Sequence, residues 1–318
     1  MPAAARKTPD EKLEVLSALS ATADRSLQNE AIQKALEDKH FRIVAKAATL
    51  AGERSLHERT ADLLSAYARF LHDPVKKDPN CLAKQAIARA LVALDCQDVN
   101  FFLEGIRYRQ LEPVWGGTAD TAVDLRCSCA MGLASSGYWR AIHELTALLN
   151  DSESRAREGA VRAISCCHPR EAEVLLRFKV LAGDKEPEVI GECFTALLNI
   201  AADECLPLVA QFLSGTDETL RDLAALALGE SRHPGALQHL RAAWDEVYVP
   251  PARRAVLLRA AALHRTEAAF DWLLSIIEND SRAHADIAVD ALAVYERNTK
   301  LIERVQTSLA KRRDTKSS

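Results

Sequence analysis

The sequence predicts an all-α solenoid, a superhelix of about eight stacked helical hairpins. A short pattern repeats along the chain with a small residue at each equivalent position, called the anchor here. The anchors are Ala48, Ala90, Gly132, Ala163, Ala196, Ala227, Ala260 and Ala291, separated by 42, 42, 31, 33, 31, 33 and 31 residues. Repeats of this length are typical of helical pairs stacked on one another. Hydrophobic residues make up 48% of the chain, with 5% aromatics and 12 glycines, which favours helices packed through Ala and Leu over β-sheet.

The 318 residues contain no Gly/Ser-rich or Pro-rich linker, so we expect one stacked domain. Residues 1–27 are interpreted as an N-terminal segment or capping helix, and residues 28–310 as the solenoid. Residues 311–318 carry a basic run that includes Lys311, Arg312 and Arg313 and are expected to be a disordered, solvated tail.

Aspartates recur 10 to 12 residues before seven of the anchors, where they are expected to be helix N-caps. They are Asp38, Asp78, Asp120, Asp151, Asp184, Asp217 and Asp280. A cation recurs six residues before most anchors, and this placement predicts a ladder of Asp–Arg pairs along the stack. These cations are Arg42, Lys84, Arg126, Arg157, Arg221 and Arg254.

Positions seven and three residues before the anchor share one helix face with it and are mostly small or apolar, so this face is the predicted core between repeats. Cys129 and Cys193 belong to it and are interpreted as packing residues rather than metal ligands. We expect the eight cysteines to be mostly reduced and buried. Trp139, Trp244 and Trp272 fall in first helices, where they would fasten one repeat to the next.

The pattern of Asp217, Arg221, Ala224, Ala227 and Leu228 resembles HEAT repeats, in particular the short bacterial HEAT-like repeat of phycobilisome bilin lyases. The resemblance spans about residues 28 to 300. It implies a concave surface lined by the second helices. It implies no single activity, because adaptors, lyases, a hydroxylase and a DNA glycosylase share the scaffold.

Positions five and one residues before each anchor form a stripe on the second helices, from Ile43 and Ala47 to Asp286 and Asp290. Its charges are mixed and its middle is weakly polar, which suits a protein or peptide partner or plain solvation, and both readings stay open. A nucleic-acid groove should be basic, and the net charge is −4. The candidate binding residues on the stripe are Arg89, Cys127, Met131, Arg162, Thr195, Leu226 and Arg259.

The repeat is interrupted by an insertion at residues 111–120, which contains Trp115 before two glycines. Long loops of solenoids frequently carry function, so Trp115 is the leading single candidate for a partner contact. The alternative is that its ring packs down and fastens the loop to the stack.

Enzymatic readings find little support in the sequence. Two His-Glu dyads, His57-Glu58 and His143-Glu144, lie 86 residues apart and do not complete an iron site. No Gly-rich phosphate loop or nucleophile elbow is present. Cys127 is the one cysteine on the stripe and is considered as a reactive thiol.

The sequence therefore favours a non-enzymatic, cytoplasmic HEAT-repeat scaffold or adaptor that binds a protein or peptide through its concave face and the Trp115 loop. No catalytic residue, metal or cofactor is assigned. The alternative is a small-molecule handling protein similar to bilin lyases, and a nucleic-acid-binding role is a third, weaker hypothesis. The absence of a long apolar run argues against a membrane span.

Overall fold

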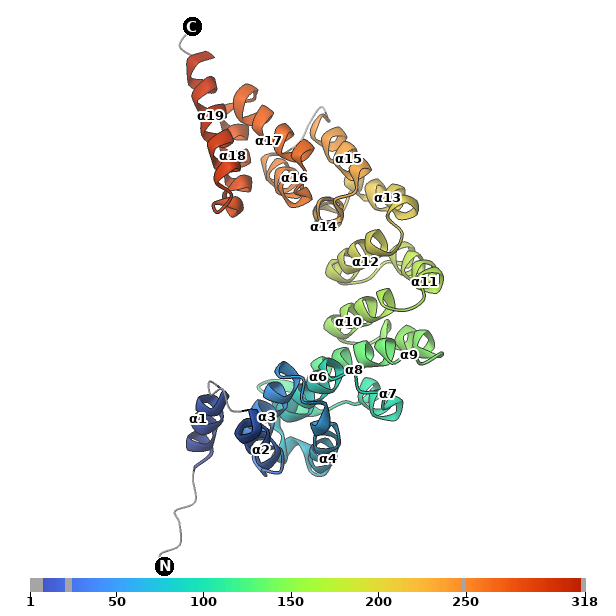
Figure 1. The fold of residues 1–318 in the computed structure, drawn as a ribbon. Helices are drawn as coiled ribbons and strands as arrows, with labels where there is room; N and C mark the ends of the chain where they lie inside the picture. The colour runs from blue at the N-terminus through green and yellow to red at the C-terminus, as the bar shows by residue number, and fades with distance from the viewer. Residues whose placement is uncertain (1–7, 21–24, 247–249, 316–318) are drawn as a thin grey trace, which may run out of the picture. The chain divides into compact units, whose positions relative to one another are not determined.

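The computed structural model describes residues 8–20, 25–246 and 250–315, and the chain divides into two compact units between His168 and Pro169. Each unit is a stack of helical hairpins (Figure 1). The units are considered one at a time.

The first unit holds four hairpins, a capping helix and a small β-hairpin. Its elements are α1 (Pro9–Ser20), α2 (Arg25–Leu36), α3 (Phe41–Glu53), η1 (His57–Arg59), α4 (Thr60–Leu71), α5 (Pro74–Lys77), η2 (Pro79–Cys81), α6 (Leu82–Ala93), α7 (Val99–Arg107), β1 (Leu111–Val114), β2 (Gly117–Asp120), α8 (Val123–Ser135), α9 (Ala141–Leu148) and α10 (Ser154–Ser165). The helical pairs are α2 with α3, α4 with α6, α7 with α8 and α9 with α10.

The second unit also holds four hairpins, followed by a last helix that packs on α17. Its elements are α11 (Pro169–Ala182), α12 (Pro187–Ile200), α13 (Ala202–Gln211), η3 (Phe212–Ser214), α14 (Glu218–Ser231), α15 (Pro234–Trp244), α16 (Pro251–His264), α17 (Glu267–Asn279), α18 (Arg282–Leu292), η4 (Ala293–Tyr295) and α19 (Thr299–Thr315). The helical pairs are α11 with α12, α13 with α14, α15 with α16 and α17 with α18.

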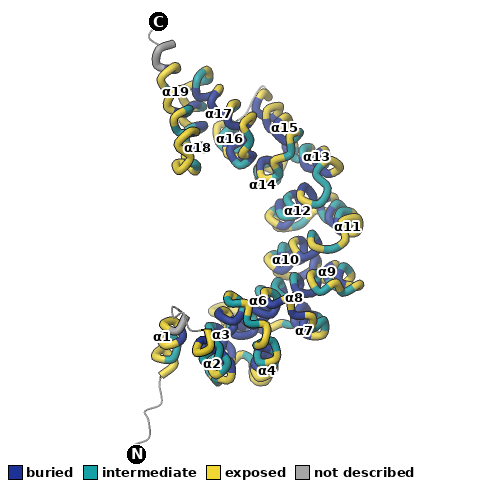
Figure 2. The backbone as a smooth tube through the Cα atoms, in the orientation of Figure 1, coloured by how far each residue is buried: buried dark blue, intermediate teal, exposed yellow. Residues whose placement is uncertain are grey.

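The second helix of each pair carries the anchor, and these helices stack on one another within each unit. In the first unit α3 packs on α6, α6 on α8 and α8 on α10, and in the second α12, α14, α16 and α18 form the same series. All eight anchors are buried, as are all eight residues three positions before them (Figure 2). The predicted α-solenoid is therefore confirmed, and so is its core face at these two positions. Seven residues before the anchor the burial is less regular, because Phe41, Leu220 and His284 are half-buried.

Close packing at the seams explains why the anchors are small. A Cβ atom added to Gly132 would lie 2.1 Å from the ring of Phe102, and one added to Gly229 would lie 2.2 Å from the backbone oxygen of Ala260. Cys129 and Cys193 are buried and free, as a packing role requires. The seams therefore leave no room for a larger side chain at these positions.

The aspartates before the anchors mostly shape the turn rather than cap the helix, so that prediction was wrong for most of them. Asp217 is an N-cap and accepts a hydrogen bond from the amide of Leu220 at 3.0 Å. Asp38, Asp151 and Asp184 instead accept from the amide two residues on, each at 2.9 Å. This bond closes an Asx turn ahead of the helix, so the residue after that turn becomes the cap.

The expected disordered tail was wrong for the residues that the structure describes, because α19 continues to Thr315. Arg312 is buried and donates to the carbonyl oxygens of Ile277 at 3.1 Å and Asp280 at 2.6 Å. A guanidinium there satisfies carbonyls at the C-terminal end of α17, where the helix dipole favours positive charge. Residues 316–318 lie outside the described residues.

Two of the three tryptophans in first-helix positions fasten neighbouring helices as predicted, and one does not. Trp244 is buried edge-on against Trp272, with Arg254 over its face at 4.4 Å. Trp139 lies in the turn before α9 and is 79% exposed, so the packing role predicted for it was wrong. No helix in the described part of the chain is both long and apolar enough to span a membrane.

Candidate functional site

The insertion at residues 111–120 folds into a two-stranded antiparallel hairpin between α7 and α8. Val114 pairs with Gly117, which leaves Trp115 and Gly116 as the two turn residues. Gly116 has a φ of +88°, a conformation that side chains other than glycine rarely adopt. The chain therefore places Trp115 at the tip of a tight turn.

This hairpin presents apolar side chains to solvent from its tip to its first strand residue. Trp115 is fully exposed, at 103%, and Leu111 and Val114 are also exposed. The alternative that Trp115 packs down on the stack was therefore wrong. Exposure of several apolar residues on one short element marks a contact site more often than single scattered residues do.

The base of the hairpin is held by the buried carboxylate of Glu112. Its Oε1 atom accepts hydrogen bonds from the amide of Asn80, from Nε2 of Gln110 and from Oγ1 of Thr121, each at 2.7 Å. Asn80 and the next residue both have positive φ angles, 59° and 53°, and this turn aims the Asn80 amide at the hairpin. Bonds to an ionised acceptor are stronger than neutral ones, so Glu112 ties the turn before α6 to both strands.

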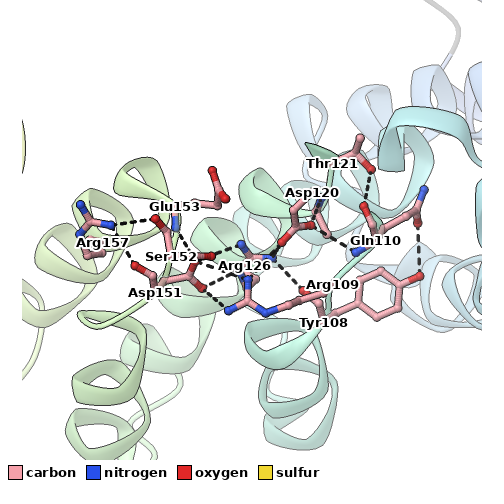
Figure 3. Close-up of polar contacts among 11 residues, drawn as sticks. Tyr108, Arg109, Gln110, Asp120, Thr121, Arg126, Asp151, Ser152, Glu153 and Arg157 are labelled. Carbon is pink, nitrogen blue, oxygen red and sulfur yellow. Dashed lines mark hydrogen bonds and ion pairs between the residues drawn. The ribbon is translucent and has the colours of Figure 1, made fainter. Parts of the chain in front are cut away.

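A second set of charges joins the hairpin to the helices behind it (Figure 3). Arg126 on α8 is buried and contacts Asp120 at the end of β2 at 2.7 Å and Asp151, in the turn of the next repeat, at 3.1 Å. Arg109 reaches the same two carboxylates, at 3.1 Å and 2.8 Å. The predicted Asp–Arg pairing is confirmed here, with one cation bridging its own repeat and the next. It does not recur at every repeat, because Arg42 pairs with Asp10, and Arg157 and Arg221 donate to backbone oxygens of their turns.

The two carboxylates respond to this environment. Burial alone would raise the pKa of Asp120, but amide hydrogen bonds and the charge of Arg126 outweigh it and hold the pKa below its ordinary value. The pKa of Asp151 is lowered in the same way, against burial, by the amide of Glu153 and by both arginines. Both groups therefore stay ionised and keep the network charged.

A fully buried pair completes the base. Lys84 Nζ lies 2.8 Å from Asp78 Oδ2 and sits over the ring of Tyr108 at 5.6 Å. Gln110 connects this pair to the hairpin, because its Nε2 donates to the backbone oxygen of Asp78 at 2.8 Å. The repeat pattern predicted the Asp78–Lys84 pair; it did not single out Gln110 or Glu112.

The candidate stripe residues of the first unit lie at or near the surface of the second helices. Arg89 and Arg162 are exposed, while Cys127 and Met131 are half-buried. Cys127 packs towards α10, where a Cβ atom added to Gly159 would meet its Sγ at 2.5 Å. Burial raises the pKa of Cys127, so it lacks the lowered pKa that a reactive thiol requires.

At the start of the stripe, Ile43 and Ala47 on α3 are buried, so their expected exposure was wrong. The reason is α1, which packs on α3. Lys12 of α1 pairs with Asp38 at 2.6 Å, and Leu16 of α1 lines the same hollow as Ile43. The capping helix therefore covers the first repeat of the stripe.

In the second unit Thr195 and Leu226 are half-buried and Arg259 is exposed. Gly191 is buried, and a Cβ atom there would meet Leu223 of the neighbouring helix at 3.0 Å. The stripe in this unit is thus a surface of mixed polarity rather than a continuous apolar track.

The His-Glu dyads do not form a metal site. His57 lies in η1 with its Nδ1 atom 3.2 Å from the carbonyl oxygen of Leu94, and Glu144 pairs with Arg107 at 2.6 Å. Among residues 8–20, 25–246 and 250–315, no group of three or more His, Cys, Asp or Glu side chains is arranged to hold a metal ion.

Comparison with known proteins identifies the repeat type in part of the second unit. Residues 174–257 match a family model described as HEAT repeats. No curated protein sequence matches the chain.

Solved structures resemble the chain only distantly. YibA of Escherichia coli is 15% identical, with 92% of this chain and 99% of that chain covered and a TM-score of 0.47. Human deoxyhypusine hydroxylase is 14% identical, covering 92% of each chain, with a TM-score of 0.31. The complex of CpcE and CpcF of phycocyanin lyase from Nostoc sp. is 15% identical, covering 98% and 100%, with a TM-score of 0.37. At these scores the likenesses carry no functional argument.

Proposed function

We propose that the chain, in which residues 174–257 match HEAT repeats, is a non-enzymatic scaffold that binds a protein or peptide partner through the 111–120 hairpin and the second helices. One observation carries the proposal: a fully exposed tryptophan at the tip of a hairpin whose base is locked by buried hydrogen bonds. Solenoids use such departures from the repeat, together with their extended helical surfaces, to bind other macromolecules.

The locked base makes the exposed tip suitable for binding. A partner that buries Trp115 gains the burial of a large aromatic ring, and tryptophan is among the residues that contribute most at protein interfaces. Glu112 and Arg126 already hold both strands in place, so little conformational entropy is lost on binding. The hairpin therefore acts as a pre-formed aromatic anchor.

The helical surface of the first unit has the composition of a protein interface. Met131 and Cys127 provide a half-buried, weakly polar centre, and Arg89 and Arg162 provide charges around it. Glu158 lies 3.9 Å from Arg162 and offsets part of its charge. With a net charge of −4 as well, this surface is less suited to a nucleic-acid backbone than to a protein.

A deep pocket beside Trp115 and Cys127 would favour a small-molecule role of the bilin-lyase type. The ring of Trp115 is fully exposed and Cys127 packs against α10, so these residues do not form the walls of such a pocket. We therefore favour a protein partner over an enclosed small ligand.

Quantitative co-purification from the native host tests the proposal. We compare the wild-type chain with Trp115→Ala and with Trp139→Ala, a matched control that removes another exposed tryptophan of the same unit outside the hairpin. A third variant adds Met131→Asp and Leu226→Asp to Trp115→Ala and so also perturbs the helical surface.

We expect Trp115→Ala to lower recovery of the partner by roughly tenfold or more, as loss of an aromatic hot spot does. Trp139→Ala should recover it as the wild type does, and the triple variant should lose it. Equal recovery by wild type, Trp115→Ala and the triple variant would contradict the proposal.

A further inference from the structure

Helix α11 has apolar residues on two faces, although only one of them is needed for the core. Its inner face is buried through Ala172, Leu176 and Val180. Val174, Phe178 and Leu181 are 69%, 67% and 74% exposed. Figure 2 shows buried and exposed colours alternating along α11. The sequence signal is the spacing of these three residues, which the repeat pattern did not use.

The outer residues follow the spacing of a helix–helix seam. Within the helix, Glu171, Val174, Phe178 and Leu181 are separated by three, four and three residues, the alternation with which paired helices present residues to each other; Lys185 follows the helix end. Glu171 and Lys185 are exposed, at opposite ends of this series. We call these five residues the α11 seam; Lys185 lies three residues beyond the end of the helix.

We propose that the α11 seam is the contact of a two-fold symmetric dimer in which the α11 helices of two copies pack antiparallel. A two-fold contact uses the same patch on both copies, and the α11 seam is complementary to itself in that direction. With Phe178 on the two-fold axis, Glu171 near the start of one α11 lies towards the end of the other, where Lys185 follows the helix. A parallel arrangement would place like charges together at both ends, which is unfavourable.

The charged side chains beside the seam are held by their own chain and do not compete for the partner copy. Arg177 pairs with Glu173 at 2.8 Å and donates to the carbonyl oxygen of Glu204 at 2.6 Å. Lys179 pairs with Asp184 at 2.7 Å. These bonds keep the polar side chains turned away from the outer face and leave Phe178 accessible.

The size of the seam sets the expected strength. From residue 171 to residue 182 the helix is roughly 17 Å long, at about 1.5 Å per residue. One such helix pair belongs to the small class of interfaces, below about 1,200 Å² in total. The dimer should therefore be weak and reversible, and association should increase with protein concentration.

Sedimentation equilibrium of the full chain from micromolar to several hundred micromolar tests the proposal. The wild type should shift from monomer to dimer, and Phe178→Asp should raise the dimer dissociation constant roughly tenfold or more. The control is Val294→Asp, which places the same charge on another exposed apolar residue of this unit, in η4. It should dimerise as the wild type does.

Charge exchange tests the antiparallel arrangement. Glu171→Lys and Lys185→Glu should each weaken the dimer a few-fold, as rim charges do, and the double variant should regain wild-type affinity because the opposite charges still face each other. A wild-type chain that stays monomeric overturns the proposal, and so does dimerisation of Phe178→Asp at wild-type strength. A double variant as weak as the sum of the single ones overturns the antiparallel pairing.

Discussion

Replacing Glu112 with alanine should loosen the base of the hairpin. The change removes an acceptor that receives three hydrogen bonds at 2.7 Å in a buried setting. A hydrogen bond to a charged group contributes about 1.5 to 3 kcal/mol, and three of them set an upper limit of roughly 5 to 9 kcal/mol. The donors share one oxygen atom and water can enter the space of a truncated side chain, so we expect a loss of about 2 to 4 kcal/mol.

The assay combines urea denaturation with hydrogen exchange of the amides of residues 110–121, because exchange reports local opening. Glu112→Gln is the matched control. It keeps the shape and one acceptor oxygen but lacks the charge, and it should lose only about 1 kcal/mol. If Glu112→Ala matched the wild type within about 0.5 kcal/mol and its hairpin amides exchanged no faster, the reasoning about the locked base would be refuted.

Three further predictions concern the seams, the charged network and the thiol. Gly229→Ala should destabilise the fold by about 1 to 3 kcal/mol, because its Cβ would lie 2.2 Å from a backbone oxygen. Gly117→Ala is the control and should be nearly neutral, because nothing lies within 4 Å of its Cβ. Thermal melting of both variants checks this. Arg126→Met should cost about 1 to 3 kcal/mol, because it removes charged hydrogen bonds to Asp120 and Asp151 while Arg109 still pairs with both carboxylates. Because the pKa of Asp151 is lowered in the fold, its ionised carboxylate contributes fully to the free energy of unfolding above about pH 4. This contribution is lost as the pH falls through the folded pKa. Parallel pH profiles of the urea midpoints of wild type and Arg126→Met would contradict this. Iodoacetamide should modify Cys127 more slowly in the native chain than in urea, because burial raises its pKa, and equal rates would show that its thiol is not protected.

The sequence predicted the repeated core because packing between stacked helices recurs with the repeat. Ala160 and Cys193 occupy equivalent positions and are both buried, as the spacing required. Such positions depend on contacts whose geometry is the same in every repeat. The repeat pattern also located the buried pair of Asp78 and Lys84, two residues that lie six positions apart in the chain.

Features that depend on segments from other parts of the chain could not be predicted in this way. The repeat pattern places Ile43 on the stripe face of its helix. Its burial depends on α1, which the repeat does not include. Arg312 donates to a backbone carbonyl group about 35 residues earlier in the chain. Helix periodicity alone cannot identify such partners.

The hairpin was predicted as a loop, although its sequence contained a usable signal. The residues Trp115-Gly116 separate two short runs, and two turn residues that include glycine are typical of a tight hairpin. The strands are four residues each and one contains Pro113, so they lack a strong strand pattern. The role of Glu112 depends on its contact with Asn80, which lies 32 residues away in the chain. A local sequence pattern cannot predict such a contact.

Site-specific photo-crosslinking from residue 115 tests the central claim, that the hairpin tip is a partner contact. A photoreactive phenylalanine analogue replaces Trp115 in one sample and Trp139 in another, both exposed in the first unit. After irradiation in the native host, position 115 should give a discrete crosslinked protein that position 139 does not give. Identical crosslinking from both positions, or none from position 115, would contradict the account.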